Sequence, residues 1–244
     1  MRAFDFGCIE KTQTVILMEI RQLIQKLKSM ANEKNVDGMV RFGINPKNTL
    51  GISVYDLRAI GKEIGKGHDL ALKLWESGIH EARILAAFVE DYNQVTEFQM
   101  ERWVNDFDSW DICDQVCNSV FAKTPFAHKK ALEWASRKSE FVKRAGFVLM
   151  ACLVLHNKNA EDKQFLGYMP IIRRESKDER NFVKKAVNWA LRQIGKKNKI
   201  LNITAIRTAK EIEQVDSKCA KWIAKDALRE LESGAVQNRL KGKK

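Results

Sequence analysis

A short segment of this chain occurs twice, and the distance between the copies limits the folds that the chain can adopt. Phe141–Ala145 (FVKRA) returns 41 positions later as Phe182–Ala186 (FVKKA), and a weaker copy, Trp222–Lys225 (WIAK), starts 40 positions after that. A period near 40 is typical of HEAT-type repeats, in which pairs of helices stack side by side. We therefore expect an all-α fold, a curved right-handed superhelix (solenoid) of HEAT-like helical repeats.

The repeat also places cations at equivalent positions. Arg144, Lys185 and Lys225 fall at the same point of successive copies. Equivalent positions of a solenoid lie on one face, which is often a concave binding surface. A row of cations on such a face predicts an anionic partner. The alternative is that Phe-Val-x-x-Ala is only a common amphipathic helix pattern.

The composition favours helices throughout. Three prolines and thirteen glycines in 244 residues are too few for a fold of many short strands. Apolar periodicity and breaks predict one domain over residues 1–244, with a basic tail, residues 239–244, that we expect to fray. The expected helices cover residues 12–30, 54–65, 69–76, 80–91, 96–105, 109–122, 127–137, 140–156, 163–171, 178–195, 199–212 and 217–232. A loop is expected at Gly43–Gly51, followed by Ser53 as a helix N-cap with Asp56 three residues later.

Several classes of protein are disfavoured by the sequence. The longest apolar run, Ala145–Leu155, is too short to span a bilayer, and from the N-terminal residues we expect no secretory signal. Five cysteines are an odd number and argue for reduced thiols, so we expect a cytoplasmic protein. Cys113 and Cys117 have a helical i, i+4 spacing, but no second ligand pair accompanies them, and no zinc site is expected.

The positive charge is concentrated in one part of the chain. The net charge is +12, and residues 141–210 alone hold sixteen Lys or Arg and five Asp or Glu, which gives +11. This asymmetry favours nucleic acid or another polyanion as the partner. A solvated basic face that only maintains solubility is the alternative.

The segment from Asp106 to Asp114 (DFDSWDICD) is the most informative local feature. Asp108 is expected as an N-cap, with Asp111 in the first helical turn. Asp114 lies beyond capping range and four residues after Trp110, so both side chains project from one helix face. A carboxylate beside an indole can bind a cationic ligand. Alternatively, Asp114 pairs with a neighbouring arginine while Trp110 packs in the core.

Two further residues are candidates for the same site. Trp189 lies four residues after Lys185 and so shares its face. Arg144 opens the apolar helix that begins near residue 140, and it could clamp a phosphate or pair with a carboxylate such as Asp114. The sequence leaves both roles of Arg144 open.

Three blocks of the chain together resemble a known family. Ser109–Asp114 (SWDICD), Lys143–Ala145 with the apolar run behind it, and Phe182–Arg192 (FVKKAVNWALR) are similar to the AlkD-like DNA alkylation repair family of HEAT-like repeat DNA glycosylases. A weaker match covers Met39–Phe42 and Leu50–Ser53. Order and spacing agree over roughly residues 30–230.

The resemblance implies an activity and the residues that carry it. The family removes cationic alkylated purines, such as 3-methyladenine and 7-methylguanine, from duplex DNA without extruding the base. By this resemblance Asp114 is the catalytic carboxylate, Trp110 and Trp189 line the lesion site, and Arg144 lies beside it. The candidates for DNA contacts are Ser53, Lys143, Lys184, Lys185 and Arg192.

The sequence departs from the family at two places, Ser109 where an aromatic residue is usual and the loop around Ser53 and Val54. These differences bear on the choice of lesion and the fit to DNA. The expected partner is double-stranded DNA with alkylated bases. We expect no metal, cofactor, membrane or obligate protein partner, and a monomer. A DNA-binding protein without catalysis, for damaged or branched DNA, and a protein-interaction scaffold are the competing hypotheses.

Overall fold

The computed structural model describes residues 20–157 and 160–242, and in these residues the regular structure is helical, without a strand. Residues 20–29 are helical, and residues 12–19 of the first expected helix lie outside the described part. The helices that follow are α2 (Glu33–Arg41), α3 (Val54–Ile64), α4 (His68–Glu76), α5 (His80–Val89), α6 (Glu97–Asn105), α7 (Trp110–Ser119), the 3-10 turn η1 (Phe121–Lys123), α8 (Ala127–Trp134), α9 (Glu140–His156), α10 (Asp162–Leu166), α11 (Met169–Glu175), α12 (Asn181–Gly195), α13 (Lys199–Glu213), α14 (Lys218–Leu231) and α15 (Gly234–Lys241).

Most helices agree with the apolar periodicity of the sequence, and the all-α prediction is confirmed. Three details differ. Helices α2 and α15 were not predicted, and the single helix expected at 163–171 is divided into α10 and α11. Residues 239–241 of the tail that we expected to fray complete α15, where Leu240 is buried.

Two helix starts test the capping predictions. Ser53 caps α3 as expected: its Oγ accepts the Asp56 amide at 3.2 Å and donates to the Asp56 carboxylate at 2.7 Å. The prediction of Asp108 as the cap of α7 is wrong, because the N-cap position is the buried Ser109. Asp111 is thus the second helical residue of α7, where its Oδ1 accepts the Ile112 amide at 3.0 Å.

The chain divides into two compact units, Met1–Thr96 and Glu97–Lys244. A single domain over residues 1–244 therefore stays a prediction. In the described part of the first unit, α3 and α4 each pack against α5. None of the described helices in either unit has the length and apolar content needed to cross a bilayer.

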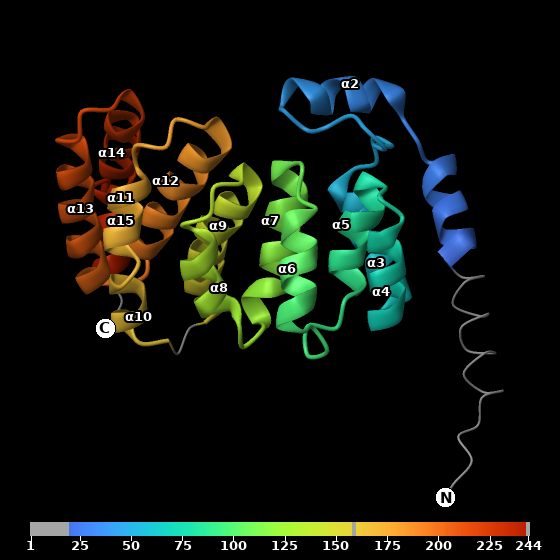
Figure 1. Cartoon of the computed structure of the whole chain (residues 1–244). Coiled ribbons are helices and arrows are strands. Elements are labelled where there is room, and N and C mark those ends of the chain that lie inside the picture. The colour runs from blue at the N-terminus through green and yellow to red at the C-terminus, as the bar shows by residue number, and fades with distance from the viewer. Residues whose placement is uncertain (1–19, 158–159, 243–244) are drawn as a thin grey trace, which may run out of the picture. The chain divides into compact units, whose positions relative to one another are not determined.

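The second unit is a stack of helix pairs. Helices α7, α9, α12 and α14 form one layer in which each packs against the next. Helix α8 packs against α9. Helix α11 contacts α12 and α13, and α13 packs against both α12 and α14, in the orange and red part of Figure 1. The two copies of the repeat stack in register, since the rings of Phe141 and Phe182 are 5.5 Å apart. This arrangement agrees with the HEAT-like repeats that the 40-residue period predicted.

Candidate functional site

Asp114 and Arg144 form a two-pronged ion pair between neighbouring helices of the layer. Nε of Arg144 donates to Oδ1 of Asp114 at 2.9 Å, and Nη2 donates to Oδ2 at 2.8 Å. Asp114 is the fifth residue of α7 and Arg144 the fifth residue of α9, and these two helices pack together. The planar guanidinium matches the two carboxylate oxygens, so the pair fixes the orientation of Asp114.

Arg144 also reaches the next helix of the layer. Its Nη1 donates to the backbone carbonyl of Phe182, at the start of α12, at 2.7 Å. The side chain of Arg144 is only 7% exposed, whereas that of Asp114 is 20% exposed. Of the two roles that the sequence left open for Arg144, this geometry favours pairing with Asp114. We expected Arg144, Lys185 and Lys225 to form a row of surface cations. This prediction is wrong for Arg144, which is buried, whereas Lys185 and Lys225 are exposed.

Burial and pairing act in opposite directions on this pair. Burial raises the pKa of the Asp114 carboxyl, and the charge and hydrogen bonds of Arg144 oppose the rise. For Arg144, burial lowers the pKa but Asp114 more than compensates, so the guanidinium pKa is raised. For Asp114 burial outweighs pairing, so its pKa stays above the usual value, while each charge of the pair favours the ionised form of the other and the partly exposed edge of Asp114 is held in place.

The two tryptophans lie on helices of the same layer. Trp110 is the first residue of α7 and is partly exposed, and its i, i+4 spacing places it on the Asp114 face of that helix. Trp189 is partly exposed on α12, the helix whose first turn Arg144 contacts. Helix α9 therefore lies between the helices that carry the two indoles. Their roles at a lesion stay predictions.

The thiols of Cys113 and Cys117 help to hold α7 against α9. Cys113 lies 3.8 Å from the carbonyl oxygen of Phe141, and Cys117 lies 3.9 Å from that of Ala145. These carbonyls flank Arg144 along α9. Burial raises the pKa of Cys117, so this thiol stays protonated and can donate weakly. Both cysteines thus help set the position of Arg144 relative to Asp114.

The expected DNA-binding residues differ in how available their charges are. Lys143 is largely buried between Glu175 at 2.5 Å and Asp178 at 3.1 Å. Arg192 bonds to Glu230 at 2.6 Å. The charges of Lys143 and Arg192 are therefore largely balanced within the protein.

Two lysines of α12 are more accessible. Lys184 lies 4.9 Å from the ring centre of Trp222. Lys185 is exposed and makes no hydrogen bond or ion pair with any residue that the structure describes. Among the expected cations of this unit, Lys185 has the charge most available to a phosphate.

Ser53 belongs to the first unit, where the buried carboxylate of Glu81 binds the backbone of the loop that precedes Ser53. Glu81 accepts the backbone amides of Leu50, Gly51 and Ile52 at 2.8, 2.7 and 3.4 Å. Gly51 has φ +80°, and an added Cβ would lie 2.2 Å from the carbonyl oxygen of Asn32, so glycine is required there. The loop before Ser53 is thus held rigidly, although its contact with DNA stays a prediction.

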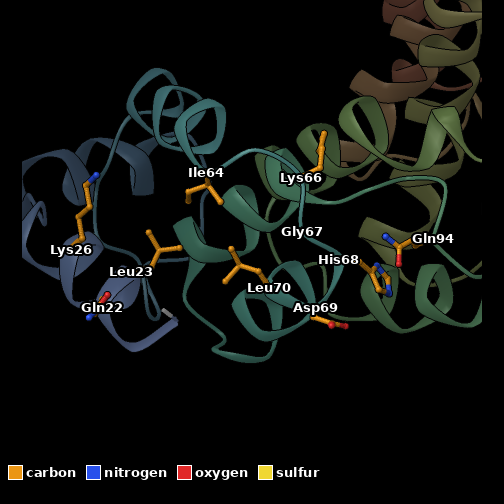
Figure 2. Close-up of a pocket in the computed structure, with 10 residues that line it drawn as sticks. All are labelled: Gln22, Leu23, Lys26, Ile64, Lys66, Gly67, His68, Asp69, Leu70 and Gln94. Atoms are coloured by element: carbon orange, nitrogen blue, oxygen red, sulfur yellow. The ribbon is translucent and has the colours of Figure 1, made fainter. Parts of the chain in front are cut away.

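The first unit also contains a pocket of about 670 Å³, which Figure 2 shows with Leu23, Ile64 and Leu70 among its lining. Two of its polar side chains are bound within the protein. Nδ1 of His68 lies 2.7 Å from the Glu90 carboxylate, and Lys66 donates to the carbonyls of Phe88 and Glu90 at 2.9 Å. None of the expected site residues lines this pocket.

Comparison with known proteins finds a protein family and solved structures of similar fold. The family model described as "DNA alkylation repair enzyme" matches residues 23–231. A solved structure, described as "a new family of proteins related to the HEAT-like repeat DNA glycosylases with affinity for branched DNA structures", superposes with a TM-score of 0.72 at 18% identity, covering 91% of this chain and 95% of that one. At this identity the superposition establishes the HEAT-like fold alone. No curated protein matches the chain.

Proposed function

The chain belongs to the DNA alkylation repair enzyme family, and from this we propose that it binds duplex DNA and hydrolyses the N-glycosidic bond of cationic alkylpurines of the 3-methyladenine and 7-methylguanine type. The observation that carries the proposal is the Asp114 carboxylate, which Arg144 holds with two hydrogen bonds at a partly exposed edge of α7. A fixed charge of this kind suits a reaction in which positive charge develops on the substrate.

The proposed reaction needs little from the protein besides that charge. The alkylated purine is already a cation, so its departure requires no strong general acid. When the bond from C1′ to the purine nitrogen breaks, the electron pair moves onto the purine and neutralises it. The deoxyribose then becomes an oxocarbenium-like cation, water adds at C1′, and a proton is released. The products are the free alkylated base and an abasic site.

In this scheme each site residue has a separate role. Asp114 stabilises the sugar cation electrostatically and can orient the attacking water. Trp110 and Trp189 offer ring faces that attract a cation more than a neutral base. Arg144 is a positioning residue, because all three of its described hydrogen bonds go to Asp114 and Phe182. Exposed lysines such as Lys185 would neutralise phosphates of the DNA.

One observation favours a second candidate, binding of damaged or branched DNA without excision. Both oxygens of Asp114 accept hydrogen bonds from Arg144, which offsets part of the negative charge that catalysis needs. The protein of similar fold is itself described by an affinity for branched DNA. A carboxylate retains further lone pairs beyond the two that Arg144 occupies, so the geometry leaves room for catalysis.

A base-release assay separates the two candidates. Purified protein is incubated with methylated duplex DNA, and free 7-methylguanine and 3-methyladenine are measured by chromatography. A duplex with hypoxanthine, a neutral lesion, serves as the comparison substrate. The proposal expects release of the cationic bases only. DNA binding with no release of either cationic base would reject the glycosylase and support the second candidate.

A further inference from the structure

Trp222 is a large aromatic side chain that the fold leaves open to solvent. It lies in the first half of α14 with 41% of its surface exposed. Its counterparts in the two earlier repeats, Phe141 and Phe182, are partly buried and pack against each other. Tryptophan is costly to expose and is enriched where proteins bind partners. The exposed indole therefore marks a candidate contact surface.

The charges around Trp222 indicate what could bind there. Lys184 lies over its ring at 4.9 Å, and Lys185 and Lys225, on α12 and α14, are exposed. Lys221, beside the indole in the chain, is also exposed, with its Nζ 3.6 Å from the exposed Asp216. These lysine charges around the indole favour an anionic partner.

Carboxylates are present in the same neighbourhood and reduce that preference only in part. Burial raises the pKa of the nearby Cys219 thiol, the charge of Lys184 lowers it, and the charges of Asp178 and Glu179 raise it, so all three charged groups lie close to this part of α14. The charge of Asp178 is balanced, since it accepts hydrogen bonds from Arg180 and Lys143. Glu179 and Asp216 are the exposed carboxylates that remain, against the exposed Lys185, Lys221 and Lys225.

Trp222 belongs to the same helix layer as the candidate site. The spacing Trp110-x-x-x-Asp114 recurs as Trp222-x-x-x-Asp226. Asp226 accepts a hydrogen bond from Asn188 of α12 at 2.6 Å, just as Asp114 reaches across to the neighbouring helix of the layer. Trp222 therefore lies on the same face of α14 as Asp226, and α14 belongs to the same layer of helices as α7, which carries Asp114.

We propose that Trp222 is a stacking platform for an unpaired nucleobase of DNA, with Lys184, Lys185 and Lys225 holding the phosphates of that strand. Every base has a π-face that can stack on an indole, so such a contact tolerates any sequence. Bases inside a duplex already stack on their neighbours, whereas those of a single-stranded tail, flap or branch have free faces. The platform therefore adds a preference for DNA with an unpaired segment. It rests on the proposed DNA-binding function and extends it.

Binding of a labelled duplex, with and without a single-stranded tail, tests the platform by fluorescence anisotropy. Wild-type protein is expected to bind the tailed DNA more tightly than the blunt duplex. Trp222→Ala should weaken binding of the tailed DNA by about 10-fold, as loss of one base–aromatic stack does, and leave the blunt duplex nearly unaffected. Trp222→Phe keeps a ring and should retain most of the preference.

Phe98 supplies the matched control, because it is an exposed aromatic residue on α6 of the same unit. Phe98→Ala should leave both affinities unchanged. Equal affinity of the wild type for tailed and blunt DNA, or an equal loss on both with Trp222→Ala, would overturn the platform and leave the proposed function standing. Failure of the wild type to bind either DNA would overturn the proposed function as well.

Discussion

Arg144 directs its charge into the protein, toward a carboxylate on one neighbouring helix and a carbonyl on the other. An arginine that is 7% exposed and engaged in this way cannot clamp a phosphate without breaking these bonds. The negative edge of Asp114 and the cation that orients it thus work as one unit. If Arg144 positions Asp114, its loss should affect the reaction rate and spare the affinity for DNA.

The substitution Arg144→Lys measures this separation. Lysine keeps the charge but cannot make two parallel hydrogen bonds, so the orientation of Asp114 should loosen. We expect the single-turnover rate of base release to fall by about 10- to 100-fold, with the dissociation constant for duplex DNA nearly unchanged. A weakened affinity with an unchanged rate would show that Arg144 contacts phosphate, the role that the pairing argues against.

Asp178 makes a stability contribution that depends on pH. Burial raises the pKa of Asp178, but the hydrogen bonds from Arg180 and Lys143 outweigh burial and lower that pKa to about 2. Since the folded pKa lies below the unfolded value of about 3.9, the ionised group stabilises the fold by about 2 kcal/mol above that pH. The contribution is lost as the pH falls from about 4 to 2.

Asp178→Asn should therefore lower the free energy of unfolding by about 2 kcal/mol at pH 7 and by the same amount at pH 5. Urea denaturation at both pH values, and at pH 4, where the difference should begin to shrink, provides the measurement. A difference between variant and wild type that grows as the pH falls would contradict the assignment.

At the scale of helices, the position of Arg144 depends on how closely α9 approaches α8. A Cβ added at Gly146 would lie 2.3 Å from the amide nitrogen of Ala135 and 2.8 Å from its Cα. Backbone atoms cannot move aside as a flexible side chain can. Glycine is thus required for this contact between α8 and α9.

Gly146→Ala should destabilise the protein by about 1 to 3 kcal/mol, because the helices must separate to admit the methyl group. Gly234→Ala is the matched control, since no atom lies within 4 Å of its added Cβ at the start of α15. The control should be neutral or slightly stabilising in a urea melt. Equal midpoints for Gly146→Ala and wild type would rule out the close approach in solution.

The helices that the sequence predicted best are those with a long apolar stripe. Helices α9, α12 and α14 bury one face or more, and their limits follow from the periodicity. Helix α2 was missed although Val36, Met39 and Val40 have helical spacing, because the segment is short and none of its residues is buried. Its start depends on local capping, with the Asn32 side chain accepting the Asn35 amide.

Sequence patterns identified the residues of the candidate site and offered Asp114 as one partner of Arg144, but they did not decide between that carboxylate and a phosphate. Arg144 and Lys185 occupy the same place in two nearly identical segments, yet one is buried and the other exposed. The difference comes from α7, which brings Asp114 within bonding distance of Arg144. Such a pairing joins residues 30 positions apart and leaves no trace in either local pattern.

At the scale of the whole molecule, several of the cations of residues 141–210 are held in internal ion pairs and are not available to a partner. Lysines of this one basic segment should therefore differ in how much each contributes to DNA binding. Lys185 is exposed, whereas Lys143 is held by Glu175 and Asp178.

Salt dependence of DNA binding tests this difference. Lys185→Ala should reduce the slope of log K against log salt by about 0.9, the value for one lost phosphate contact. Lys143→Ala should leave the slope unchanged while lowering the midpoint of urea unfolding, since it removes an internal ion pair. The reverse pattern would mean that Lys143 leaves its carboxylates to bind phosphate.

The proposed reaction depends on a single charge at Asp114, and the release of 7-methylguanine from duplex DNA under single-turnover conditions tests that charge most directly. Asp114→Asn keeps the shape of the side chain and should slow release by about 100- to 1,000-fold. Asp162→Asn removes the same charge from a carboxylate of α10 that accepts hydrogen bonds from Asn198, and it should retain the wild-type rate. An Asp114→Asn protein that releases the base as fast as wild type would contradict the account.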